Sequence, residues 1–195
     1  QILLMALAKP AACVLAVEPC FVMYKMIARF VGMNYIGVPL TPDFQIHRDE
    51  TLAAIQTCQP AIIFLAEPNN PTGNHFDPET VEAIIQAAPG LVVIDEAYLP
   101  FSDRQALPLL EKYPQVMIMR TLSKQGLAGL RLGLLVGRPE LLHECEKVRL
   151  PYNINVLTQA VATLCLTHQA EFDAQAKRIC AERDRLQTEL KQVGL

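Results

Sequence analysis

Three apolar runs of the sequence each end in polar residues of the kinds that carry out chemistry. These residues are Asn70 after the run Ala61–Ala66, Asp95 and Tyr98 after the run Leu91–Ile94, and Ser123 and Lys124 after the run Val116–Met119. If the runs are parallel strands, their carboxyl ends meet at one edge of a sheet, which is where open α/β proteins bind ligands. The sequence therefore predicts that an amide, a carboxylate, a phenol, a hydroxyl and an amine gather at that edge.

Each of these residues taken alone has a plain structural explanation. The segment Asn70–Gly73 has the composition of a turn, Asp95 is a suitable helix cap, and Lys124 is a suitable solvated loop residue. Taken together, they match one chemistry. A lysine that binds pyridoxal phosphate as a Schiff base needs an acid for the ring nitrogen and ligands for the phosphate. Asp95 would supply the acid, and Ser123 and Arg131 would supply the phosphate ligands.

The elements that would position these residues alternate along the chain. Continuous apolar runs, typical of strands buried on both faces of a parallel sheet, are Cys13–Val17, Ala61–Ala66, Leu91–Ile94 and Val116–Met119, with weaker ones at Tyr35–Val38 and Leu132–Val136. Helical patterns lie between them at Phe21–Phe30, Asp49–Thr57, Pro78–Ala87 and Pro139–Lys147. Asp77 is the expected N-cap of the third helix, and Pro78 its first residue. The alternation predicts an α/β fold, a three-layer doubly wound and mostly parallel sheet.

The pattern changes after Pro151, where no further strand is predicted. The segment Val156–Thr167 is apolar enough to predict a buried helix. The segment Phe172–Val193 has the spacing of a long amphipathic helix. A long helix with no strand after it suggests a connection to a further part of a larger protein.

The composition excludes several classes of protein. The 195 residues carry a formal net charge of -3 and are 51% hydrophobic, which is too apolar for a disordered chain and too evenly charged for a nucleic-acid-binding arm. No stretch reaches the roughly 18–20 apolar residues of a membrane-spanning helix. The 6 cysteines form no C-x-x-C pair and lack partners at metal-binding spacing, so we expect reduced core thiols and no metal site.

Four blocks of the sequence resemble the fold type I pyridoxal-phosphate aminotransferases. They are Pro68-Asn69-Asn70-Pro71-Thr72-Gly73, Val93-Ile94-Asp95-Glu96-Ala97-Tyr98, Arg120-Thr121-Leu122-Ser123-Lys124 and Ala128-Gly129-Leu130-Arg131-Leu132-Gly133. Their order and rough spacing agree with that family, and the resemblance runs from Gln1 to Leu195. Within the family, the chain is most similar to the histidinol-phosphate branch.

The resemblance implies a role for each matched residue. Lys124 would hold the cofactor covalently and move a proton, and Asp95 would pair with the ring nitrogen. The remaining matches are Asn70 and Tyr98 on the ring hydroxyl oxygen, Ser123, Arg131 and Thr121 on the phosphate, and Phe21 stacked on the ring. Two departures affect the phosphate loop. Arg131 follows Lys124 by 7 positions, one fewer than is common in the family, and Gln125 replaces a small residue.

The resemblance also implies what kind of protein this chain serves. Residues 1–170 would form the cofactor-binding large domain without its N-terminal part, and residues 171–195 a helix leading into a small domain outside the chain. The groups that close the phosphate site and select the substrate are expected beyond both ends, so we expect these 195 residues alone to be inactive.

The implied enzyme is a cytoplasmic homodimer with small-molecule substrates, an amino acid and a 2-oxo acid. It would transfer an amino group between histidinol phosphate and 2-oxoglutarate in histidine biosynthesis. Three alternatives stay open. One is another fold type I aminotransferase or decarboxylase, aspartate-like or phosphothreonine-type. The second is a non-catalytic domain that senses pyridoxal phosphate or an amino acid. The third is a structural or dimerisation fragment with no bound cofactor.

Overall fold

A six-stranded sheet organises the chain in a computed structural model, which describes residues 1–194. In chain order its strands are β1 (Cys13–Glu18), β2 (Asn34–Pro39), β3 (Ile62–Ala66), β4 (Leu91–Asp95), β5 (Val116–Thr121) and β6 (Gly133–Val136). Their order across the sheet is β2-β1-β3-β4-β5-β6. The first five strands run parallel, and β6 runs antiparallel to β5. The expectation of a mostly parallel α/β sheet is therefore confirmed.

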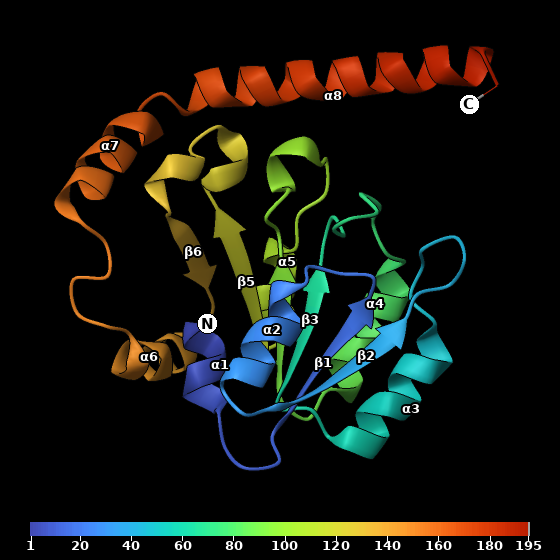
Figure 1. The fold of residues 1–195 in the computed structure, drawn as a ribbon, viewed down its shortest axis with the longest axis vertical. Coiled ribbons are helices and arrows are strands. Elements are labelled where there is room, and N and C mark those ends of the chain that lie inside the picture. Colours follow the sequence, from blue (N-terminus) through green and yellow to red (C-terminus); the bar gives the residue numbers. More distant parts are fainter. Residues whose placement is uncertain (195) are drawn as a thin grey trace.

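Helices cover both faces of this sheet (Figure 1). One face is covered by α1 (Ile2–Leu7), α2 (Met23–Phe30) and α6 (Pro139–Val148), and the other by α3 (Arg48–Cys58), α4 (Pro78–Ala87) and α5 (Leu107–Lys112). Alternate strand residues enter the two cores: Ile62 packs with the first layer and Ile63 with the second, and both are 0% exposed. Burying a large aliphatic side chain contributes roughly 1.5–3 kcal/mol, which explains why these strands have continuous apolar runs.

In the longer helices, the boundaries agree with local sequence signals such as capping residues and a proline at the first helical position. Asp77 accepts a hydrogen bond from the backbone nitrogen of Thr80 at 2.9 Å, and Pro78 is the first residue of α4, as predicted. Helix α2 begins at Met23, two positions after the expected Phe21. The six-residue helix α5 was not predicted, because so short a segment shows little periodicity.

The register of the parallel strands aligns their carboxyl ends. Ala66 at the end of β3 pairs with Asp95 at the end of β4, and Asp95 pairs with Met119 near the end of β5. Short 3-10 turns follow, with η1 (Leu99–Phe101) after β4, and η2 (Ser123–Gln125) and η3 (Ala128–Leu130) after β5. The polar residues that follow these three neighbouring strands therefore share one edge.

Two helices complete the described chain, α7 (Val156–Leu166) and α8 (Gln169–Gln192). Helix α8 passes beyond the carboxyl edge of the sheet (Figure 1). There the Cys180 thiol lies 3.7 Å from the carbonyl oxygen of Phe101. The prediction that the Val156–Thr167 helix is buried is wrong for the described residues. Val156 and Leu157 are each 77% exposed, since no described element packs against that side of α7. None of the helices within residues 1–194 is long and apolar enough to cross a membrane.

Candidate active site

Asp95 occupies the last position of β4, in the centre of the sheet. It is 9% exposed, and each of its carboxylate oxygens accepts one hydrogen bond. Oδ1 accepts from the backbone nitrogen of Ala97 at 3.0 Å, and Oδ2 accepts from the hydroxyl of Tyr24 at 2.6 Å. Burial raises the pKa of Asp95, and the two hydrogen bonds act in the opposite direction. The fold thus holds a carboxylate in a fixed orientation at the carboxyl edge of the sheet.

Lys124 lies in η2, directly after β5. Its Nζ atom is 5.0 Å from the centroid of the Tyr98 ring, within the range of a cation–π contact. Tyr98 follows β4, so this contact joins the loops of two neighbouring strands. Gly126, with φ +86°, ends the turn in a conformation that side chains rarely adopt. The sequence block that carries Lys124 therefore folds as a tight turn with the amine exposed above the phenol ring.

The loop after β3 carries Asn70, and its neighbour Asn69 anchors it. The Asn69 amide donates hydrogen bonds to the carbonyl of Pro19 at 3.1 Å and to the hydroxyl of Thr72 at 2.7 Å. Asn69 is 2% exposed, and it was not among the predicted site residues. The Pro19 contact connects this loop to the segment after β1 that contains Phe21. Asn70 itself is half-buried on the anchored loop.

The predicted phosphate ligands occupy the hairpin between β5 and β6. The Thr121 hydroxyl accepts a hydrogen bond from the backbone nitrogen of Ser123 at 3.1 Å and donates one to the carbonyl of Leu132 at 3.3 Å. Arg131 is exposed and has a left-handed backbone, with φ 52°. Within residues 1–194, no hydrogen bond or ion pair joins the Arg131 side chain to the other predicted site residues. The structure thus places Thr121, Ser123 and Arg131 on one hairpin, without a hydrogen bond between their side chains.

Tyr24 is a site residue that the sequence reasoning missed. Its ring stacks on Phe64 of β3, with centroids 4.5 Å apart and planes 9° apart, and it packs in a T-shaped contact with Phe21, with centroids 5.6 Å apart. Tyr24 is 4% exposed, whereas Phe21 is 42% exposed. Burial and the charge of Asp95 raise the pKa of Tyr24 far above its usual range, so its hydroxyl stays protonated. In sequence Tyr24 has the pattern of an ordinary core aromatic, and no local signal marks its contact with a residue 71 positions away.

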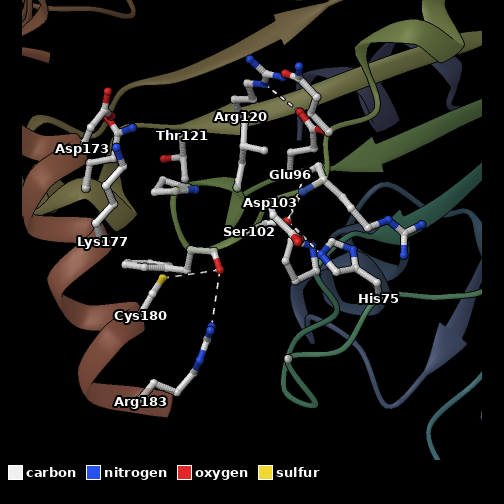
Figure 2. A pocket seen from close by; sticks show the side chains of 18 of the residues that line it. His75, Glu96, Ser102, Asp103, Arg120, Thr121, Asp173, Lys177, Cys180 and Arg183 are labelled. Atoms are coloured by element: carbon white, nitrogen blue, oxygen red, sulfur yellow. Dashed lines mark hydrogen bonds and ion pairs between the residues drawn. The ribbon is translucent and has the colours of Figure 1, made fainter. Parts of the chain in front are cut away.

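A second feature of this edge is an open cavity of about 1200 Å³ between α8 and the loops after β3, β4 and β5, which we call the α8 groove (Figure 2). Of the predicted site residues, only Thr121 lines it. On its wall, Glu96 forms an ion pair with Arg120 at 2.7 Å. His75 contacts Glu67 through Nδ1 at 3.0 Å and the Ser102 hydroxyl through Nε2 at 2.8 Å. The groove was not anticipated, because it depends on where α8 lies.

The donor set at the sheet edge has a defined chemical preference. A buried carboxylate suits a cationic ring nitrogen, and an exposed primary amine suits a carbonyl carbon. The hydroxyls of Thr121 and Ser123, with an arginine, suit an anionic group. Aromatic faces at Phe21 and Tyr98 suit a planar ring. A planar, phosphorylated and carbonyl-bearing cofactor therefore fits the residues that the fold places here.

Comparison with known proteins places the chain among related sequences. The family described as "Aminotransferase class I and II" matches residues 1–195. Histidinol-phosphate aminotransferase 2 of Nitrosococcus oceani is 50% identical over 193 residues, which cover 99% of this chain and 54% of that protein. Histidinol-phosphate aminotransferase 1 of Burkholderia lata is 52% identical over 187 residues, which cover 95% of this chain and 52% of that protein. The chain thus spans about half the length of the curated relatives it matches.

A solved structure supports the same grouping. The histidinol-phosphate aminotransferase of Sinorhizobium meliloti, in complex with pyridoxal-5'-phosphate, superposes with a TM-score of 0.83 at 29% identity. The match covers 94% of this chain and 52% of that one.

Proposed function

The chain belongs to the class I and II aminotransferases, and from that premise we propose that it is part of a pyridoxal-phosphate-dependent transaminase of histidine biosynthesis. The substrates we propose are histidinol phosphate as amino donor and 2-oxoglutarate as acceptor. The observation that carries the proposal is that a buried, doubly hydrogen-bonded Asp95 ends β4 and an exposed Lys124 lies in the turn after the neighbouring strand β5. The choice of substrate is supported by the names of relatives whose sequences are about 50% identical to this chain.

Each residue of the site has a task in this proposal. Pyridoxal phosphate, when bound, supplies an electron-withdrawing ring that stabilises negative charge on the substrate carbon bearing the amine. Asp95 holds the proton of the ring nitrogen in place by charge pairing. Lys124 would hold the cofactor through its amine and, as a free amine, would move a proton at that carbon as a general acid–base.

The other predicted residues orient the cofactor. Asn70 and Tyr98 would bind the ring hydroxyl oxygen, and Phe21 would lie against the ring face. Thr121, Ser123 and Arg131 would hold the phosphate, and the backbone contacts of Thr121 support the turn that presents the Ser123 and Arg131 side chains. Positioning of this kind lowers the activation barrier of the reaction, because the reacting atoms are already held in the orientation that the reaction requires.

A substrate panel tests the proposal directly. The intact protein, supplied with pyridoxal phosphate and 2-oxoglutarate, is assayed with histidinol phosphate, aspartate and phosphothreonine, and glutamate and carbon dioxide are both measured. We expect glutamate formation with kcat/KM highest for histidinol phosphate. Decarboxylation of phosphothreonine, or a preference for aspartate, would redirect the assignment within the family. Cofactor binding without turnover of any donor would favour a sensing domain.

The proposal extends to the organisation and location of the protein. We propose that residues 1–170 are the cofactor-binding domain and that the helix beyond them leads into a further domain. We also propose a cytoplasmic homodimer. Six free cysteines support a reducing compartment, and the exposed apolar side chains of Phe30, Val156 and Leu157 are suited to burial in an assembly. Light scattering of the intact protein measures its mass, and a monomeric mass would contradict the dimer.

A further inference from the structure

We propose that Tyr24 is a positioning residue for Asp95, because its hydroxyl fixes the carboxylate for the ring nitrogen of the cofactor. This inference rests on the proposed function, since it assigns Asp95 to that nitrogen. It goes further by adding to the site a residue 71 positions away in the chain. The contact joins α2 to the end of β4 at 2.6 Å, through a hydroxyl that makes this one hydrogen bond within the described chain.

The position of the Tyr24 hydroxyl is determined by the packing of its ring. One face lies almost parallel to the Phe64 ring, with centroids 4.5 Å apart, and Phe21 packs against Tyr24 in a T-shaped contact. The backbone nitrogen of Tyr24 donates to the carbonyl of Phe21 at 3.1 Å, at the start of α2. The Tyr24 side chain is therefore already ordered in contact with Asp95 before a ligand binds. Binding then costs no entropy for ordering this side chain, which is what preorganisation means.

The electrostatics give the hydroxyl a second effect. A buried carboxylate is costly to ionise, and every hydrogen bond it accepts favours the ionised form. Tyr24 and the backbone of Ala97 are the two groups whose hydrogen bonds act in this way on Asp95. Cys20 and Tyr35 are the other titratable groups near Tyr24, with the Cys20 thiol 3.7 Å from the Tyr35 hydroxyl. Loss of the Tyr24 hydroxyl should therefore raise the pKa of Asp95 further.

The alternative is that Tyr24 only fills the core. Tyr24→Phe separates the two roles, because it keeps the ring and its stacking and removes only the hydroxyl. Tyr113→Phe is the matched control. Tyr113 is also buried, at 9% exposed, and its hydroxyl also donates to a carboxylate, Glu82, at 3.1 Å. It lies in the core on the other face of the sheet, away from Asp95.

The experiment uses the intact protein in three forms: wild type, Tyr24→Phe and Tyr113→Phe. Asp95 is titrated without cofactor by carboxyl carbon-13 NMR, with its signal assigned from an Asp95→Asn sample. The dissociation constant of pyridoxal phosphate is then measured by equilibrium dialysis. We expect Tyr24→Phe to move the Asp95 titration to higher pH and to weaken cofactor binding on the order of tenfold, as for a lost hydrogen bond to a charged group. We expect Tyr113→Phe to leave both unchanged.

The outcomes separate this inference from the proposed function. An unchanged Asp95 titration and an unchanged dissociation constant in Tyr24→Phe would overturn the positioning role. A wild-type protein that binds no pyridoxal phosphate would instead overturn the proposed function and, with it, the assignment of Asp95 to a cofactor. If Tyr24→Phe does not fold, 3-fluorotyrosine is placed at position 24. Its more acidic hydroxyl is a stronger donor, so the Asp95 titration should move to lower pH, and no movement would contradict the inference.

Discussion

The Nζ atom of Lys124 lies 5.0 Å from the centroid of the Tyr98 ring, so the loops after β4 and β5 meet above the carboxyl edge of the sheet. These two residues belong to sequence blocks that follow different strands, and the β4–β5 pairing brings them together. The contact leaves the amine at the surface, where a cofactor or substrate can reach it.

Replacing Lys124 tests the covalent role directly. In the intact protein Lys124→Ala should abolish transamination and also prevent borohydride from attaching pyridoxal phosphate to the chain, because no amine remains at that position. Mass spectrometry of the reduced protein measures the attachment. Lys177→Ala is the control, since Lys177 lies on α8 in the α8 groove and has no proposed contact with the cofactor. Cofactor still fixed to Lys124→Ala would place the reactive amine elsewhere.

The ion pair of Glu96 and Arg120 should be important for stability. The Glu96 side chain is 1% exposed, and besides Arg120 it accepts a hydrogen bond from the backbone of Ala106. Glu96→Gln leaves the guanidinium partly buried without its counter-charge, and we expect a loss of about 3 kcal/mol in the free energy of unfolding. Urea unfolding of the intact protein measures this loss.

An exposed ion pair provides the comparison for Glu96. Glu82→Gln removes a carboxylate that pairs with Lys112 at the surface, where the partners are 36% and 55% exposed, and it should change stability little. Equal losses of unfolding free energy in the two variants would show that the buried Glu96 ion pair contributes no more to stability than the exposed one.

Gly90 marks a place where two backbone segments approach closely. A Cβ atom at this position would lie 2.3 Å from the carbonyl oxygen of Ala61, where β3 and β4 begin. Gly90→Ala must therefore displace backbone, and we expect a cost of roughly 1–3 kcal/mol in unfolding free energy. Gly129→Ala is the control, because a Cβ there meets nothing within 4 Å. A Gly90→Ala protein as stable as wild type would show that the two backbone segments can move apart without a loss of stability.

Alkaline pH should weaken the fold partly through Cys13. This thiol begins β1 and is 5% exposed, and burial, with Cys58 beside it, raises its pKa from 9.0 to about 12. Because the folded state favours the protonated thiol, its contribution is complete below pH 9.0 and is lost as pH rises toward about 12. Unfolding free energies at pH 8, 9.5 and 10.5 should fall less steeply in Cys13→Ala than in wild type. Parallel slopes would assign the alkaline loss to other groups.

Much of the fold was predictable because it rests on local chemistry. A strand buried on both faces must be continuously apolar, and the runs at β1, β3, β4 and β5 satisfy that condition. The N-cap Asp77 and Pro78, the first residue of α4, are local signals that indicate where this helix begins. Exposure was less predictable. The apolar pattern of α7 indicates that its side chains favour burial, but it does not specify what would cover them.

The sequence by itself determined the strand ends at which Asn70, Asp95 and Lys124 stand, and hence the chemistry they can support, because parallel strands bring their carboxyl ends to one edge. Only the tertiary structure decided that Tyr24 meets Asp95 and that α8 encloses a groove beside them. The physical reason is distance along the chain. Periodicity and turn chemistry act over a few residues, whereas a contact across 71 positions depends on strand order, register and helix packing together.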